Sequence, residues 1–470
     1  MNQDHLRKLP SIDTLLRDPA VEEMISLYGR GTVTRAARST LDDLRTRIQS
    51  GPPVEEHELD PDLIKRKIAV SIEAAFKPSL RRAVNAAGVV LHTGLGRALL
   101  SESAQKALRD CTEGYCTLAT DIESGRRGHR DIHVADLICE LTGAEAATVV
   151  NNNAAATMLI LNSLAAGKEV ILSRGQLVEI GGSFRMPDVM AASGAVLREV
   201  GTTNKTHLRD YRDAVGENTA AIMRAHHSNY RIVGFFSEPS ITELAEVAAE
   251  HEVFLIDDLG SGALVDLARY GLESEPLVRD SLKAGADVAC FSGDKLIGGP
   301  QSGIIVGRKP VIEKIKKNPL ARSLRVGKMT LSVLEATLKL FLTPDRLELD
   351  HPNYRLFAMD VKSIETRALK VKRKLSAALG GRAQLDVVDG GTQVGSGSVP
   401  AQTIPTRLLR IKPASMSTTT LAKRLRERDI PIFTRIQDDA VLLDFRTVLR
   451  GEEAHITEAV TTVFSKEQPS

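Results

Sequence analysis

The sequence predicts an α/β fold, with a mostly parallel sheet in a large domain, a small helical domain before it and a small α+β domain after it. From about residue 84 onward, short apolar runs alternate with helical segments, as in open α/β sheets. Several of these runs are continuous rather than alternating, which is expected of parallel strands buried on both faces. The residues before 84 have helical spacing, and those after 342 mix the two patterns.

Residues 1–60 are predicted to form the helical N-terminal domain. Ser11 has the character of a helix start, and the apolar positions within residues 34–48 recur at helical spacing. A Gln-Ser-Gly-Pro-Pro run at residues 49–53 interrupts the helical pattern, so we expect a domain boundary near it. Residues 61–83, which contain a charged helix up to about residue 76, are assigned as a linker helix.

The large domain is assigned to residues 84–342 and the small C-terminal domain to residues 343–470. In an open α/β sheet, ligands bind at the carboxyl ends of the strands, so polar residues just past the apolar runs are candidates for a site. The strands expected in the large domain are residues 147–150, 169–172, 195–197, 220–223, 254–256, 287–290 and 303–306. Those expected in the C-terminal domain are residues 408–411, 430–433 and 440–444.

The bulk properties favour a cytoplasmic protein. The net charge of +2 gives no sign of nucleic-acid binding. No apolar stretch reaches the roughly 18 residues of a membrane span, and residues 1–8 lack the apolar core of a signal peptide. The four cysteines show no metal-binding spacing, so we interpret them as reduced thiols and expect no metal site.

Lys295 carries the clearest chemical signal. It follows the apolar run 287–290, and an earlier strand ends at Asp257 and Asp258. A lysine past one strand and a carboxylate at the end of another suit pyridoxal 5'-phosphate (PLP), because the lysine holds the aldehyde as an imine and the carboxylate keeps the pyridine nitrogen protonated. We prefer Asp257, which directly follows the apolar run and is expected to point inward. The simpler alternatives are a surface lysine and a capping carboxylate.

The PLP phosphate is expected at residues 151–156, which follow a strand and open a helix. Backbone N–H groups at a helix N-terminus bind phosphate, and Asn152, Asn153 and Ala154 are the candidates there. An ordinary helix cap would also explain this run, but its position ahead of the aspartate and lysine strands favours the phosphate. Ser292, shortly before Lys295, offers a hydroxyl to the same group.

The chain resembles the bacterial selenocysteine synthase family, the PLP-dependent L-seryl-tRNA(Sec) selenium transferases. The resemblance covers nearly the whole length, and it implies the aspartate aminotransferase-like fold of PLP-dependent transferases for the large domain. The lysine motif is specific to this family and its close relatives, and the N-terminal match points to the tRNA-using branch. The residues that carry the resemblance are 9–13, 85–97, 173–185, 228–232, 292–301 and 393–398.

The resemblance also implies roles for particular residues. Lys295 would carry PLP and Asp257 would pair with its pyridinium. Arg97, Arg322 and Arg325 would bind selenophosphate; the last two would share a helix face if residues 321–326 were helical. From charge alone, Arg322 and Arg325 would be interpreted as residues of a solvent-exposed helix face. The resemblance favours anion binding instead.

Seryl-tRNA(Sec) is the implied partner, and Arg30, Arg35 and Arg38 of the N-terminal domain are the candidates for contacts with its backbone. The implied reaction eliminates the serine hydroxyl to give an aminoacrylyl group and then adds selenium. The implied assembly is a homo-oligomer built from dimers, up to a homodecamer. Two departures from the family pattern stand out: Gly94, where the family has asparagine, and the His226-His227 pair, which we interpret as structural, with a proton shuttle as the alternative.

Two alternatives remain open. A PLP lyase or aldolase acting on a small free amino acid or amino-sugar acid would need an arginine for the substrate carboxylate, and Arg435 or Arg446 could serve. A non-catalytic RNA-binding or scaffolding protein could have kept the fold without holding PLP on Lys295.

Overall fold

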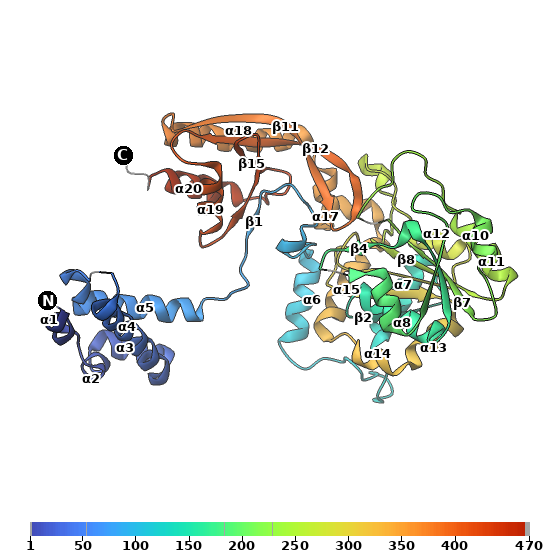
Figure 1. The fold of residues 1–470 in the computed structure, drawn as a ribbon, viewed down its shortest axis with the longest axis horizontal. Helices are drawn as coiled ribbons and strands as arrows, with labels where there is room; N and C mark the ends of the chain where they lie inside the picture. The colour runs from blue at the N-terminus through green and yellow to red at the C-terminus, as the bar shows by residue number, and fades with distance from the viewer. Residues whose placement is uncertain (1, 53, 183, 228, 466–470) are drawn as a thin grey trace. The chain divides into compact units, whose positions relative to one another are not determined.

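The structure is a computed structural model that describes residues 2–52, 54–182, 184–227 and 229–465. Ser183 and Ser228, which belong to runs that carry the resemblance, and Pro53, in the interrupting run, lie outside the described residues. The chain divides into two compact units, Met1–Arg82 and Ala83–Ser470, whose helices and strands are labelled in Figure 1.

The N-terminal unit is helical, as predicted. Ser11 accepts a hydrogen bond from the Thr14 backbone N–H at 3.1 Å and so caps the second helix. Asp60 caps the fifth helix in the same way, through the Asp62 N–H at 2.9 Å. The helices are α1 (Asn2–Lys8), α2 (Ile12–Leu16), α3 (Pro19–Tyr28), α4 (Arg30–Ser50) and α5 (Pro61–Phe76), with a 3-10 turn at Glu56–Leu59.

The core of this unit corrects the predicted boundary at residue 60. Ile64, Ile68 and Ile72 recur every four residues along α5, so they form one buried stripe. The stripe packs in the same core as Leu41 and Leu44 of α4. Residues 61–83 therefore are not a separate linker helix: α5 is an integral helix of the N-terminal unit.

The large domain is built on a seven-stranded sheet in which all seven predicted apolar runs are strands. The order is β2-β10-β9-β8-β7-β3-β6. Only β10 is antiparallel to its neighbours, so the sheet is mostly parallel, as predicted. The strands are β2 (Ala146–Val150), β3 (Glu169–Ser173), β6 (Val196–Val200), β7 (Thr219–Ala225), β8 (Phe254–Gly260), β9 (Val288–Ser292) and β10 (Gly303–Gly307).

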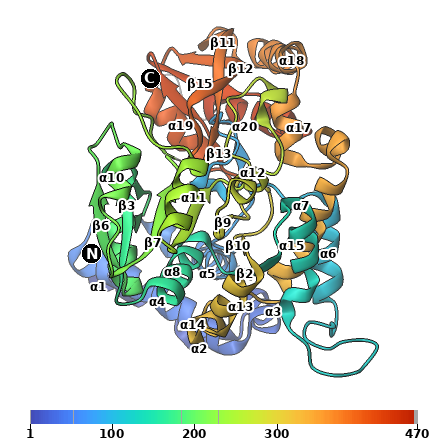
Figure 2. The same ribbon diagram turned by 90° about the vertical axis from the view of Figure 1, so that its right-hand side faces the viewer.

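Helices cover both faces of this sheet (Figure 2). One face packs against α8, α9 and α13, and the other against α7, α10, α11, α12 and α15. Because side chains alternate along a strand, neighbouring residues of each strand enter different cores. The helices of this domain are α6 (Glu102–Thr112), α7 (Ala135–Thr142), α8 (Asn153–Ala165), α9 (Met186–Ser193), α10 (Leu208–Arg212), α11 (Ile241–Glu250), α12 (Val278–Lys283), α13 (Lys309–Lys317), α14 (Pro319–Ser323) and α15 (Lys328–Leu338).

The small C-terminal domain is a four-stranded antiparallel sheet packed against helices. Its strands are β11 (Ala383–Gly395), β12 (Ser398–Pro413), β14 (Arg435–Gln437) and β15 (Ala440–Asp444), and its helices are α18 (Val361–Leu379), α19 (Thr418–Arg426) and α20 (Glu452–Ser465).

The structure changes the predicted extent of the C-terminal domain, residues 343–470, in two ways. Two helices precede α18, namely α16 (Leu347–Asp350) and α17 (Pro352–Ala358), and they bury Leu347, Tyr354, Leu356 and Phe357 in the core of the large domain. In the other direction, β1 (Val84–Asn85) pairs in parallel with β13 (Ile432–Phe433), so the first residues after the N-terminal unit belong with the C-terminal domain. Throughout the described residues, no helix is long and apolar enough to cross a membrane.

Candidate functional site

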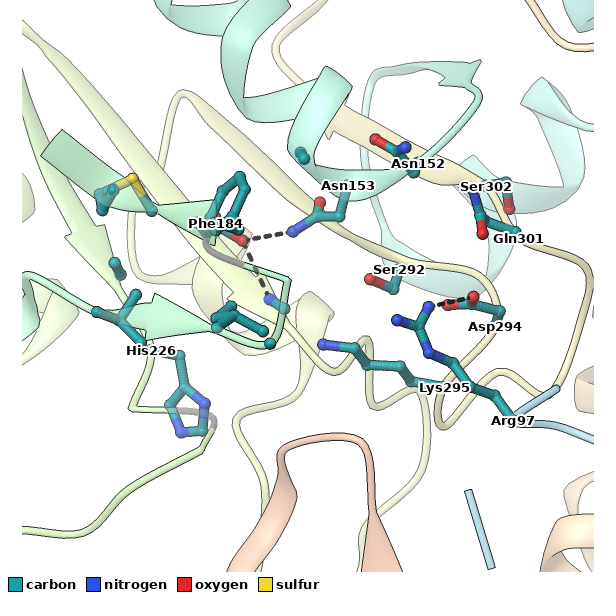
Figure 3. Close-up of a pocket in the computed structure, with 18 residues that line it drawn as sticks. Arg97, Asn152, Asn153, Phe184, His226, Ser292, Asp294, Lys295, Gln301 and Ser302 are labelled. Atoms are coloured by element: carbon teal, nitrogen blue, oxygen red, sulfur yellow. Dashed lines mark hydrogen bonds and ion pairs between the residues drawn. The ribbon is translucent and has the colours of Figure 1, made fainter. Parts of the chain in front are cut away.

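A cavity lies at the carboxyl ends of β2, β7, β8 and β9, where an open α/β sheet is expected to bind its ligand (Figure 3). The antiparallel strand β10 begins at the same edge, and Gln301 and Ser302 just before it also line the cavity. The structure brings together there most of the residues predicted for the cofactor: Lys295, Ser292, Asn152, Asn153 and Ala154, together with Arg97.

Lys295 is buried and its side chain extends into the cavity, with Arg97 alongside it (Figure 3). Burial lowers the pKa of its ammonium group, and the Asp258 carboxylate opposes this shift. A buried amine with a lowered pKa is more easily deprotonated, which is the form that attacks carbonyl carbons.

The turn that carries Lys295 is braced from behind by α17 and the residue before it. The Asn353 side chain donates to the Lys295 carbonyl at 3.2 Å, and His351 Nε2 lies 2.8 Å from the Ile297 carbonyl. Gly298 has φ +72°, and a Cβ there would lie 2.2 Å from the His351 ring, so glycine is required on both counts. The lysine therefore sits on a fixed turn.

Asp258, rather than Asp257, faces this cavity, which corrects the sequence prediction. Its carboxylate accepts hydrogen bonds from the Asn153 amide at 2.8 Å and the Thr157 hydroxyl at 3.1 Å. Burial raises the pKa of Asp258, while these two hydrogen bonds and Lys295 lower it.

Asp257 points to the opposite face of β8. It is fully buried and receives two hydrogen bonds from the guanidinium of Arg224, at 2.8 and 2.7 Å, and one from the Ser281 hydroxyl. Arg224 is its direct neighbour on β7, so the two form a cross-strand pair. The role of Asp257 is thus to hold the strand end.

The alternation of side chains along β8 determines which of the two aspartates faces the cavity. Ile256 packs in the core beneath α8, and Leu255 packs in the core beneath α11. Since side chains repeat every two residues, Asp258 shares the α8 face with Ile256, and Asp257 shares the other face with Leu255. Placing the predicted phosphate helix over one face would therefore have selected Asp258.

The start of α8 forms a cradle beside these groups. Asn152 caps the helix by accepting from the Ala155 N–H at 2.8 Å. A Cβ at Gly303 would lie 2.1 Å from the Asn152 carbonyl, so the strand and the cradle approach as closely as glycine permits. Asn153 Oδ1 and His226 Nδ1 are buried, and neither has a hydrogen-bond partner within the described ranges.

His226 lines the cavity, although the sequence favours a structural residue there over a proton shuttle. It follows β7 and lines the cavity, and burial lowers its pKa. Its Nδ1 lies 3.8 Å from Glu275, whose carboxylate is fixed by the Ser261 hydroxyl at 2.8 Å and the Val399 N–H at 2.7 Å. The expectation that polar residues just past an apolar run are site candidates, which pointed to Lys295, would also have pointed to His226.

His227, by contrast, is structural, as predicted for the pair. Its Nε2 lies 3.1 Å from the Gly175 carbonyl, and its ring packs edge-on against Tyr230 and Phe236.

The three arginines predicted to bind selenophosphate do not meet within one chain. Arg97 lines the Lys295 cavity and donates to Asp294 at 2.5 Å. Arg322 and Arg325 line a separate hollow. Residues 321–326 do not form one helix, which was the condition for Arg322 and Arg325 to share a helix face: α14 ends at Ser323, and Arg325 pairs with Val150 as an isolated bridge.

Gly94, the departure from the family pattern, lies in a 3-10 turn at Thr93–Leu95, just before Arg97. A Cβ there would meet the ring of His92 at an ordinary 3.4 Å, and no positive φ requires glycine. Steric constraints therefore do not explain the glycine.

Arg30, Arg35 and Arg38 are exposed on α4 of the N-terminal unit. None of the three guanidiniums forms an ion pair with another described residue, whereas Arg45 on the same helix pairs with Asp42 at 2.8 Å. Their charge is therefore available to a partner.

Arg435 and Arg446 are the candidates for binding the carboxylate of a free amino acid. Neither of them lines the Lys295 cavity. Arg446 is buried and donates to the carbonyl groups of Leu356, Met359 and Pro405. Arg435 donates to the Gly391 carbonyl at 3.2 Å. Among the described residues, no cluster of histidine, cysteine and carboxylate side chains could hold a metal ion.

Comparisons with known proteins identify the family of this chain. Residues 83–449 match the family model for L-seryl-tRNA selenium transferase, and residues 6–45 match the model for the selenocysteine synthase N terminal region. The chain is 44% identical to the L-seryl-tRNA(Sec) selenium transferase of Alkaliphilus metalliredigens, over 97% of this chain and 98% of that one. It is 48% identical to the Methylocella silvestris enzyme of the same name, over 94% of each chain.

Among solved structures, a D-glucosaminate-6-phosphate ammonia-lyase shares the fold. The TM-score is 0.57 at 21% identity, and the match covers 84% of this chain and 98% of the other.

Proposed function

We propose that this chain, which belongs to the L-seryl-tRNA selenium transferase family, converts L-seryl-tRNA(Sec) to L-selenocysteinyl-tRNA(Sec). Selenophosphate is the selenium donor in this proposal. The observation that carries the proposal is the cavity that joins the buried amine of Lys295, the Asp258 carboxylate and the start of α8. These are the groups that a seryl amine, its α-proton and a phosphate-bearing cofactor require.

The residues of this cavity fit PLP. The N-terminus of α8 and the hydroxyls of Ser292 and Ser302 suit its phosphate. Asp258 suits the pyridine nitrogen, and the unpartnered His226 Nδ1 suits a polar ring substituent. When bound, PLP supplies an aldehyde that captures amines and a ring that accepts electrons from the α-carbon.

Each cavity residue then has a defined task. Lys295 would hold the PLP aldehyde, and its amine is placed to remove the α-proton of the seryl group. Asp258 would keep a proton on the ring nitrogen of PLP. Loss of the α-proton and the β-hydroxyl releases water. Selenium from selenophosphate then adds to the β-carbon while a proton returns to the α-carbon, and a water molecule takes the phosphoryl group, which leaves as inorganic phosphate.

The N-terminal unit supplies the tRNA contacts in this proposal. Arg30, Arg35 and Arg38 present unpaired charge along one helix, which suits a phosphate backbone recognised by shape. The proposed reaction takes place in the cytoplasm, because aminoacylated tRNA is used in that compartment.

The active assembly is a homo-oligomer built from dimers. Arg97 lies in the Lys295 cavity of its own chain, and Arg322 and Arg325 lie outside it. A site that uses all three therefore takes Arg322 and Arg325 from a second subunit. A ring of such dimers, up to a homodecamer, is the larger form that we propose.

A single-turnover assay tests the function. PLP-loaded protein is mixed with labelled selenophosphate and either serine-charged tRNA(Sec) or ordinary seryl-tRNA. We expect label on the aminoacyl group of tRNA(Sec) alone. Label on neither tRNA, together with turnover of a free amino acid, would overturn the proposal in favour of a small-molecule lyase.

A further inference from the structure

A second concave site, which shares no lining residue with the Lys295 cavity, holds several positively charged side chains. Its walls include Arg127, Arg130, Arg322 and Arg325, and we call it the arginine hollow. Arg127 and Arg130 come from the loop before α7, far in sequence from the other two.

The charge of the arginine hollow is not balanced within the chain. Its two carboxylates, Asp131 and Glu313, lie 3.9 and 3.4 Å from Lys316, and Asp131 also accepts the Thr148 hydroxyl at 2.8 Å. Across the described ranges, no carboxylate lies within ion-pair distance of any of the four guanidiniums. Arg130 donates only to a backbone carbonyl, that of Val326, at 3.3 Å.

The four guanidiniums therefore repel one another. Arg130 is the largest cause of a lowered pKa at Arg325, followed by desolvation and by Arg322 and Arg127. Like charges held together in a concave wall create a potential that attracts an anion.

The hollow is preformed and tied to the cofactor cradle. Arg127 pairs with Thr120 as an isolated bridge, and the Gly128 N–H donates to the Ala119 carbonyl at 3.1 Å, which fixes the loop. On the other side, the Asn151 N–H donates to the Leu324 carbonyl at 3.0 Å. The segment that carries Arg325 is thus bonded to the residue directly before the cradle.

We propose that Arg127 and Arg130 are further anion-binding residues, which with Arg322 and Arg325 form a site for a tetrahedral oxyanion of the phosphate class. Forked guanidinium donors from two directions match such an anion, whose several oxygens accept paired hydrogen bonds. The inference rests on the proposed function, in which selenophosphate is that anion, and extends it to two residues of the loop before α7.

Binding of inorganic phosphate to the PLP-loaded full chain, measured by calorimetry, tests the site directly. We expect Arg127→Gln and Arg130→Gln each to weaken phosphate binding by about tenfold or more, since each removes charged hydrogen bonds. Arg126→Gln is the matched control: it lies in the same loop, is exposed and does not line the hollow. Its phosphate affinity should equal that of the unaltered chain.

Thermal unfolding of each variant checks that the loop change leaves the fold intact, and Arg130→Lys supplies a second measurement. It keeps the charge without the fork, so it should recover only part of the affinity. Absence of phosphate binding in the unaltered chain, or equal affinity in all the glutamine variants, would overturn the inference. Weakened tRNA binding with unchanged phosphate binding would overturn it in favour of an RNA contact.

Steady-state kinetics of selenium transfer distinguish failure of this inference from failure of the proposed function. In selenium transfer, Arg127→Gln and Arg130→Gln should raise the KM for selenophosphate by about tenfold or more and leave the affinity for tRNA unchanged. Selenium transfer with an unchanged KM in both variants would overturn the inference alone. Arginine-dependent phosphate binding without any selenium transfer would overturn the proposed function and leave the anion site standing.

Discussion

At the scale of single residues, two adjacent aspartates have opposite environments. Asp258 meets Asn153 and Thr157 at the edge of the Lys295 cavity, while Asp257 is locked to Arg224 behind the strand. One residue of difference along a strand reverses the face, and with it the role, of a carboxylate.

The two aspartates should therefore respond differently to the same substitution. Asp258→Asn should slow loss of the seryl hydroxyl by about 100-fold or more, because an amide holds a ring-nitrogen proton poorly, with the unfolding midpoint little changed. Asp257→Asn should lower the free energy of unfolding by about 3 to 5 kcal/mol, because it leaves Arg224 without its buried partner. Single-turnover rates and denaturant unfolding measure the two effects. Equal rate losses in both variants would contradict the assignment.

His351 gives a pH-dependent prediction. Burial lowers its pKa to about 4, from 6.5. The folded state therefore binds this proton less readily than the unfolded state, so stability is complete above about pH 6.5 and falls as the pH drops toward 4. By pH 5 the loss should be about 2 kcal/mol.

Denaturant unfolding at pH 7.5 and pH 5.0 measures this loss, with His351→Asn as the comparison. The variant should be less stable at pH 7.5, because the contact with the Ile297 carbonyl is removed. It should, however, lose less stability on acidification than the unaltered chain. The same acid sensitivity in both proteins would remove His351 as its cause.

At the scale of elements, the close approach of β10 to the start of α8 positions the phosphate cradle. Gly303→Ala would place a methyl group 2.1 Å from the Asn152 carbonyl and push the helix start away. We expect PLP to bind about tenfold more weakly or worse, since charged hydrogen bonds to its phosphate would be lost.

Gly216→Ala is the matched control, because a Cβ there meets no atom within 4 Å. Titration of the PLP absorbance band measures both affinities. Unchanged PLP binding by Gly303→Ala would show that the cradle does not depend on this contact.

Elements also show which parts of the molecule can be predicted from sequence. The seven central strands could be predicted because each contains a short apolar run, which is a local property of the sequence. The two-residue strand β1 was not, because its identity depends on pairing with β13, which lies far along the chain. The same reason explains the arginines: spacing could suggest that Arg322 and Arg325 lie together, but not that Arg97 lies in another cavity.

At the scale of the whole molecule, the N-terminal unit is a separable body with its own core. Removal of residues 1–82 should abolish tRNA binding and leave the PLP absorbance intact. Removal of residues 1–60 should additionally cause aggregation, because it exposes Ile64, Ile68 and Ile72. Filter binding and light scattering measure these outcomes.

The combined Arg30, Arg35 and Arg38 to glutamine variant tests the same claim without a deletion, with Arg45→Gln as its control. The triple variant should bind tRNA more weakly, whereas the control should resemble the unaltered chain. Tight tRNA binding by the protein that lacks residues 1–82 would contradict the assignment of this unit.

Sharing of the site between subunits can be tested by mixing two inactive variants. Lys295→Ala lacks the amine, and Arg325→Gln lacks the anion contact. If a site takes one residue from each subunit, dissociation and reassociation of the mixture should restore about a quarter of the activity, because half of the dimers are mixed and each has one complete site. No recovery, with mixed dimers shown by mass spectrometry, would place both residues in the same chain's site.

The pairing of β1 with β13 has a consequence for synthesis on the ribosome. Val84 and Ala86 complete the core of the C-terminal domain together with Ile432 and Val441, so this domain needs both an early and a late stretch of the chain. At ordinary translation speeds the early stretch waits roughly 20 to 70 s for its partner. The N-terminal unit is complete well before then, so a nascent chain carries a finished helical unit ahead of a domain whose core closes only after Val441 has been added.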